Sequence, residues 1–118
     1  MSSPKFQPRR SAMWADQFGK AEFVIWRENP KSPTAAEYLA TAKMQHAYAV
    51  VIRKRARTKY RSIKGYAEAC GVSYDRMTKV LRGEALMRLD DIGQAQHLLG
   101  DLHVEAMKVL SRRLEPQG

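Results

Sequence analysis

Apolar positions recur with a helical period on both sides of Gly71, within the stretch GYAEACGVSYDRMTKVLRG at 65–83. Positions three and four apart share one face of a helix, so the pattern predicts two short helices that each bury one face. Ala67 is small enough for the second helix to cross close above it, and Gly71 tolerates the left-handed backbone of a tight turn. The apolar positions are Tyr66, Cys70, Val72, Met77 and Val80.

Longer helical patterns stand before and after this stretch. Thr34 and Glu37 form a capping box, which predicts the start of a long helix that reaches the basic cluster at 53–61. Its apolar stripe consists of Leu39, Met44, Ala47, Tyr48, Val51 and Ile52. A helix within 84–99, ended by Gly100, has the apolar positions Leu86, Leu89, Ile92, Ala95, Leu98 and Leu99. The last predicted helix, at 101–114, has Val104, Met107, Leu110 and Leu114.

The pattern is ambiguous before position 34. Within 11–29, which Ser11 is placed to cap, one helical face would consist of Trp14, Phe18, Ala21 and Ile25. The piece AEFVIWR at 21–27 is instead rich in strand formers, but we favour a helix that ends before the prolines at 30 and 33. Residues 1–10 offer little to bury and are predicted to be a flexible basic arm, with contact to DNA as the functional alternative.

Charge is the feature of the composition that bears most on function. The 118-residue chain has 21 Lys and Arg against 12 Asp and Glu, a net charge of +9. Between Arg53 and Arg82, ten basic residues stand against Glu68 and Asp75, so most of the excess lies there. A concentrated positive field attracts phosphate and is typical of nucleic-acid-binding domains. The alternative for 53–61 is a solvated last helical turn that complements the helix dipole.

Other classes of function find little support in the sequence. Cys70 is the single cysteine and is interpreted as a small core residue, which suits a reducing cytoplasm. His46, His97 and His103 have no ligand spacing with acids or thiols, so no metal or other cofactor is expected. We see no signal peptide and no apolar run near the ~20 residues of a membrane span. Without paired acids, a nucleophile with its base or a phosphate loop, we expect no enzyme and no catalytic residue.

The stretch SIKGYAEACGVSYDRMTKVLRGEALMRLDDIGQAQHLLG resembles the helix-turn-helix domain of the Cro/CI (XRE-type) family of phage repressors and bacterial regulators. The resemblance covers residues 44–100 and depends on Ala67, Gly71 and Val72, on the apolar Met77 and Val80, and on LRGE followed by a helix ending in LLG. Leu81 stands where family members often carry an acid. The resemblance implies an all-α, lambda-repressor-like bundle of about five helices with an N-terminal extension. The extension covers residues 1–33, and the DNA-binding domain covers 34–118 and contains the helix-turn-helix motif at 62–83.

In this family the helix at 73–82 enters the major groove while the preceding helix crosses the DNA backbone. The resemblance therefore implies base reading by Ser73, Tyr74, Asp75, Thr78 and Lys79. It implies backbone contacts at Ser62 and Lys64, to which the basic cluster adds Arg53, Lys54, Arg55, Arg57, Lys59, Arg61, Arg76 and Arg82. Structural alternatives exist for three of these: Tyr74 packs on the helix surface, Asp75 is a favourable charge near a helix N-terminus, and Arg76 points away from DNA.

The expected function is a sequence-specific regulator of transcription that binds double-stranded DNA, acts as a repressor, is cytoplasmic and nucleoid-associated, and has no membrane partner. A homodimer is expected, with the interface at 101–114 or in the aromatic segment 11–33. The alternative is an antitoxin-like or phage accessory module that binds a protein partner through one of these segments, so that DNA binding is secondary. An exposed aromatic surface at 11–33 favours the alternative, whereas burial of Trp14 and Trp26 weakens it.

Overall fold

A helix of 28 residues, α1 at Pro33–Tyr60, organises the chain. The computed structural model describes residues 6–27 and 30–111. Ser32 caps α1, because its hydroxyl accepts a hydrogen bond from the Ala35 amide at 3.0 Å. The capping box predicted at Thr34 is therefore wrong. Pro33 fits the first turn of a helix, where no amide donor is needed, and so the helix begins earlier than predicted.

The predicted apolar stripe of α1 is largely confirmed. Leu39, Ala47, Tyr48, Val51 and Ile52 are buried in the core. Met44 is exposed, and the neighbouring turn instead buries Ala42, Gln45 and His46. The helix ends where Arg61 adopts the left-handed conformation at φ 68°, a conformation that is uncommon for a residue with a side chain.

Two short helices follow, α2 at Ile63–Cys70 and α3 at Tyr74–Leu81. Gly71 has the left-handed backbone predicted for the turn, with φ 73°, and the Val72 amide bonds to the Ala67 carbonyl at 3.1 Å. The predicted pair of helices and their turn are thus confirmed. Tyr66, Ala67, Met77 and Val80 are buried, while Cys70 and Val72 are half-buried against the core.

The fourth helix, α4 at Leu89–Leu99, begins later than predicted. The Asp91 carboxylate accepts a hydrogen bond from the Arg88 amide at 2.8 Å, and this contact fixes the start of the helix. Leu86 therefore lies in the preceding loop, and both it and Leu89 are exposed, contrary to the prediction that they are core residues. Gly100 ends α4, as its position predicts.

The last helix, α5 at His103–Ser111, packs along α1. The core face predicted for it is wrong at Val104 and Met107, which are both exposed. The helix packs on α1 through the small side chain of Ala106 instead, and Val104 and Met107 point outward. Leu110 is half-buried, and Leu114 lies outside the described residues. The residues buried by this contact are Leu102, Ala106 and Val109.

The segment before α1 is not the α-helix predicted for 11–29. It contains two short 3-10 turns, η1 at Pro8–Ser11 and η2 at Ala15–Gln17. After these turns the chain doubles back, and the Met13 amide bonds to the Ile25 carbonyl at 2.7 Å. The strand formers at 21–27 thus pair with the preceding segment rather than extend a helix.

Contacts with distant residues explain this departure from the helical pattern. Phe18 is fully buried, and Gly19 adopts a left-handed conformation with φ 73°. A β-carbon at Gly19 would lie 2.1 Å from the Leu81 carbonyl oxygen, so the backbone of the segment is seated directly on the end of α3. The chain reverses here because only glycine combines this conformation with so close an approach.

The flexible arm predicted for residues 1–10 is wrong for its described part. Phe6 stacks on Tyr38 with ring centroids 4.2 Å apart, and Pro8 is buried. The Arg9 amide bonds to the Gly83 carbonyl at 3.0 Å. Residues 6–10 therefore pack on the body of the protein, and the prediction for residues 1–5 lies outside the described residues.

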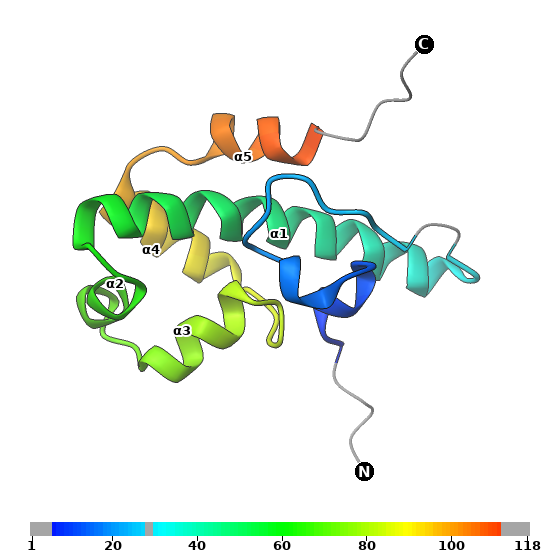
Figure 1. Cartoon of the computed structure of the whole chain (residues 1–118), viewed down its shortest axis with the longest axis horizontal. Coiled ribbons are helices and arrows are strands. Elements are labelled where there is room, and N and C mark those ends of the chain that lie inside the picture. The colour runs from blue at the N-terminus through cyan, green and yellow to red at the C-terminus, as the bar shows by residue number, and fades with distance from the viewer. Residues whose placement is uncertain (1–5, 28–29, 112–118) are drawn as a thin grey trace.

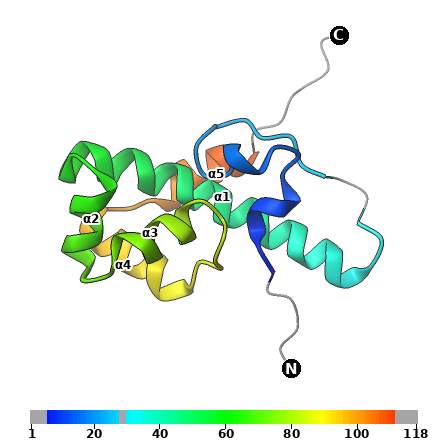
Figure 2. The same cartoon turned by 60° about the horizontal axis from the view of Figure 1, so that its bottom comes forward.

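Figure 1 shows α5 on one side of α1 and the pair α2 and α3 on the other. In the turned view of Figure 2, α2, α3 and α4 gather around the C-terminal half of α1, and the N-terminal segment crosses nearer its middle. The described residues form five α-helices and no β-strand, with one isolated bridge between Ala12 and Trp26. None of the described helices is long and apolar enough to cross a membrane.

Candidate nucleic-acid interface

The outer face of α3 is polar and charged. Helical spacing places Asp75, Lys79 and Arg82 on one face, opposite the buried Met77 and Val80. The Lys79 ammonium lies 3.1 Å from the Asp75 carboxylate, and the Arg82 guanidinium lies 2.8 Å from the Glu84 carboxylate. These charges are presented on a short helix that is anchored from behind by apolar packing.

The predicted hydroxyl-bearing residues of α3 are partly engaged by the backbone. Ser73 caps α3, since its hydroxyl oxygen accepts from the Arg76 amide at 3.1 Å. The Thr78 hydroxyl donates to the Asp75 carbonyl at 3.0 Å. Ser73 therefore keeps its proton for a ligand, whereas Thr78 keeps an oxygen lone pair. Tyr74 is exposed beside them at the start of the helix.

Arg76 connects α3 to α4 rather than extending outward. Its guanidinium lies 3.2 Å from Asp91, and both side chains are mostly shielded from solvent. Asp91 also holds the amide at the start of α4, so this one carboxylate joins two helices. The structure therefore places Arg76 in the arrangement that the sequence offered as an alternative to contact with DNA.

The basic cluster at the end of α1 divides into two sides. On one side Arg55 bonds to Glu105 at 2.8 Å and to the carbonyls of Leu99 and Asp101. On the same side Lys59 donates to the Leu98 carbonyl, and Lys54 lies 3.5 Å from Glu105. Cations at the C-terminal carbonyls of a helix stabilise it, so these three residues hold α4 and α5 against α1. Arg55 and Lys54 correspondingly lower the pKa of Glu105.

Arg53 and Arg57 belong to the other side of α1. The Arg53 guanidinium donates to the Gly19 carbonyl at 3.1 Å. Burial lowers its pKa, with further lowering from the positive charges of Arg57 and Arg82 and an opposite effect from Tyr74. The Gly19 carbonyl that Arg53 contacts lies where the N-terminal segment meets the end of α3, so Arg53 lies close to α3. We call Arg53, Arg57, Tyr74, Lys79 and Arg82 the basic face.

The corner between α1 and α2 extends the positive surface. Arg61 and Lys64 are exposed there. Ser62 caps α2, because its hydroxyl accepts from the Gly65 amide at 2.9 Å. The first amides of a helix carry partial positive charge, so the start of α2 adds to the field of these two side chains.

One residue that organises this region was missed by the sequence analysis. The buried side-chain amide of Gln45 donates to the carbonyls of Val80 and Ala85, each at 2.9 Å. Its oxygen accepts from the Met87 amide at 2.8 Å. Gln45 thus fixes the loop that leaves α3. No local signal identifies it, because a glutamine within a helix usually faces solvent.

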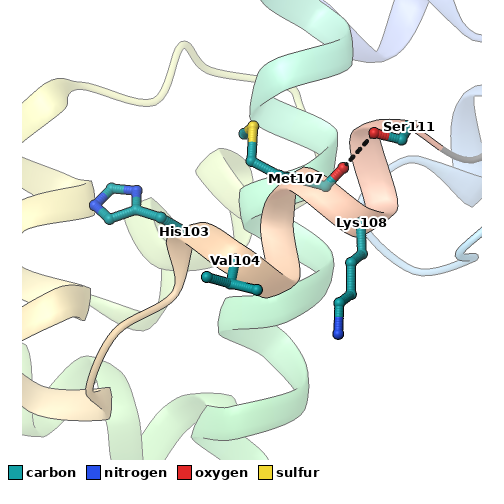
Figure 3. Close-up of a pocket in the computed structure, with 5 residues that line it drawn as sticks. All are labelled: His103, Val104, Met107, Lys108 and Ser111. Atoms are coloured by element: carbon teal, nitrogen blue, oxygen red, sulfur yellow. Dashed lines mark hydrogen bonds between the residues drawn. The ribbon is translucent and has the colours of Figure 1, made fainter.

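A second surface lies on α5, away from the basic face. An open hollow is lined by His103, Val104, Met107, Lys108 and Ser111, and Figure 3 shows these side chains along the exposed side of the helix. Val104 is 63% exposed. The Ser111 hydroxyl donates to the Met107 carbonyl at 2.8 Å and so does not contribute an outward donor. The hollow is mainly apolar and has no arrangement of acid, base and nucleophile.

The described residues contain no group of three His, Cys, Asp or Glu side chains able to hold a metal ion. Burial raises the pKa of the Cys70 thiol, which disfavours the reactive thiolate. Comparison with family models, with curated proteins and with solved structures gives no significant match. The geometry of the basic face is therefore the basis for any functional proposal.

Proposed function

We propose that the protein is a sequence-specific regulator that binds double-stranded DNA and represses transcription. The observation that carries the proposal is the outer face of α3, where hydrogen-bonding side chains stand on a short, apolar-anchored helix close to Arg53 of α1. A helix of this size fits the major groove, where side chains distinguish base pairs. The resemblance to the Cro/CI family leads to the same proposal and adds the lambda-repressor-like helix-turn-helix arrangement for α2 and α3.

In this proposal the outer face of α3 and the basic residues around it have different tasks. Tyr74, Asp75 and Lys79 contact base edges, together with the hydroxyls of Ser73 and Thr78. Arg57, Arg61 and Lys64 contact phosphates, and the partly buried Arg53 adds its charge to the positive field that attracts them. Phosphate contacts position a protein on DNA, whereas base contacts carry sequence information.

We also propose that the protein binds DNA as a homodimer through α5. The exposed Val104 and Met107 lie on the side of the molecule opposite α2 and α3, as Figure 1 shows for the helix that carries them. For both α3 helices to enter successive major grooves, about 34–36 Å apart, the two copies have to meet along the flank of α5 rather than back to back, so that both helices face the same DNA. A palindromic operator is the expected result.

Selection of binding sites from random duplex DNA at near-physiological salt tests this function. Wild type is expected to enrich a palindrome, and the variant Tyr74→Ala/Lys79→Ala is expected to lose it. The control Met44→Ala/Lys31→Ala removes an exposed apolar side chain and a lysine outside α3, and it should retain the palindrome. A wild-type protein that enriches no sequence would overturn the proposal.

A second candidate is the protein-interaction module, favoured by the N-terminal segment. Met13, Trp14, Phe23 and Ile25 are all at least 40% exposed. Trp26 weakens this candidate, because it is half-buried and packs edge-on against Phe18 and His46. The test of this candidate is the variant Trp14→Ser/Phe23→Ser. If the DNA selection fails, and this variant stays folded but loses a defined protein complex that wild type forms, the protein is better described as an interaction module.

A further inference from the structure

Resting on the proposed function, we infer that Asp75 and Lys79 act as one unit that selects a G·C base pair in each half of the operator. The two residues are one helical turn apart on the outer face of α3. Their charged groups lie 3.1 Å from each other, with the side chains 75% and 50% exposed respectively. A ligand that approaches α3 therefore meets an acceptor and a donor side by side.

The pair can be matched to the major groove by its hydrogen-bonding capacity. An ammonium only donates, and a carboxylate only accepts. The edge of a G·C pair offers the acceptors N7 and O6 of guanine, followed by the N4 donor of cytosine. O6 and N4 are neighbours because they pair with each other. Lys79 on guanine and Asp75 on cytosine N4 would therefore keep their present spacing while both contact the same base pair.

An A·T pair fits the same two side chains less well. Its donor, adenine N6, stands between two acceptors, adenine N7 and thymine O4. With Lys79 on N7, the carboxylate of Asp75 on N6 still meets the lone pairs of thymine O4, and with Lys79 on O4, the thymine methyl group crowds the ammonium. Such repulsive contacts contribute to specificity as much as favourable ones do. In a G·C pair the far side of N4 carries only the C5 hydrogen of cytosine.

The pairing also explains how an acid is tolerated at a DNA-binding surface. The phosphate backbone repels an isolated carboxylate, but Lys79 compensates the charge of Asp75 before DNA arrives. Asp75 is further favoured by its place in the first turn of α3. If Asp75 had only a structural role, it would pair with Lys79 and stabilise the start of α3. Replacing it would then leave the operator sequence unchanged.

The test compares selected operators for wild type, Asp75→Asn and a control, Asp90→Asn. Asp90 is also an exposed acid in the first turn of a helix, α4, and lies 3.6 Å from Arg88. Wild type and the control should enrich one invariant G·C pair per half-site. Asp75→Asn should shift that position toward A·T, because an asparagine amide bonds to both N6 and N7 of adenine.

Titration of duplexes that differ only at this position gives the magnitude. Replacing G·C by A·T should weaken wild-type binding roughly 5- to 150-fold and should favour Asp75→Asn. The losses caused by Asp75→Ala and Lys79→Ala on the G·C duplex should be strongly non-additive in the double variant, as expected of a unit. An enriched operator whose preferences do not change in Asp75→Asn would overturn the inference alone. Failure of wild type to enrich any operator would overturn the proposed function, and the inference with it.

Discussion

His46 joins the N-terminal segment to α1, and its environment requires a neutral imidazole. It is 4% exposed, and its Nδ1 accepts a hydrogen bond from the Gly19 amide at 2.8 Å. The rings of Phe18 and Trp26 pack against it edge-on. Burial lowers the pKa of His46 from 6.5 to about 4. Protonation of Nδ1 would remove the acceptor for Gly19, so this contact depends on pH.

We expect acid to weaken folding through His46. Between pH 6.5 and 4 the unfolded chain holds a proton that the folded imidazole does not. The stability present above pH 6.5 is therefore lost as pH falls, and the loss levels off below pH 4 at about 3 kcal/mol. Urea unfolding across this range measures the effect. His46→Gln keeps an acceptor for Gly19 and should flatten the profile.

Two glycines with the same backbone conformation should respond very differently to alanine. Gly19 and Gly71 both have φ 73°, but no atom lies within 4 Å of a β-carbon at Gly71. Gly71→Ala should therefore cost only the left-handed strain, about 1–2 kcal/mol. Gly19→Ala adds a collision with the Leu81 carbonyl and should cost ~1–3 kcal/mol more. Thermal unfolding of both variants checks the order, and equal losses would contradict the seating of Gly19 on α3.

At the scale of elements, the last turns of α1 serve two different neighbours. A run of basic residues looks uniform in the sequence, yet helical spacing sends its members in different directions. Arg55 bonds to Glu105 and to the loop after α4, whereas Arg57 is exposed and belongs to the basic face. The two residues therefore allow the structural and the electrostatic contributions of the cluster to be separated.

Methionine at position 55 should lower stability, whereas methionine at position 57 should change the salt dependence of DNA binding. Arg55→Met leaves Glu105 without its closest partner and should lower the free energy of unfolding by about 1–2 kcal/mol. Arg57→Met should change stability by less than about 0.5 kcal/mol. It should instead reduce the salt dependence of DNA binding by roughly one phosphate contact. Denaturation and binding at several salt concentrations test both expectations, and a normal salt slope for Arg57→Met would remove it from the interface.

Elements specified by local spacing could be predicted from the sequence, and those specified by distant contacts could not. Ala67 and Gly71 mark α2 and its turn because their requirements are met within a few residues. The segment around Phe18 and Gly19 follows a helical pattern but folds otherwise, since its partners lie at the end of α3. Likewise, the outward turn of Val104 depends on how closely α5 meets α1, which no local pattern encodes.

At the scale of the whole molecule, α1 separates two surfaces. The helices α2 and α3 lie on one side, and α5 lies on the other, as Figure 1 shows. The N-terminal segment connects to the first of these through the Arg9–Gly83 hydrogen bond and the contact of Gly19 with Leu81. This separation keeps the exposed side of α5 away from α3, so the two surfaces can be altered independently.

Removing the exposed apolar side chains of α5 should therefore separate dimerisation from DNA contact. We expect Val104→Ser/Met107→Ser to be monomeric by light scattering. Its affinity for a two-half-site operator should fall roughly 100-fold, because linked sites gain that much from simultaneous binding. Binding to a single half-site should be unchanged, since α3 is intact.

The matched control is Leu86→Ser/Leu89→Ser, which removes two exposed apolar side chains beside and within α4. Leu89 is 83% exposed, more than either target residue on α5, so a general effect of surface polarity would appear in the control as well. The control should keep the self-association of wild type. If both double variants dissociate equally, or neither does, the dimer interface is not on α5, and the exposed residues of the N-terminal segment become the surface to test.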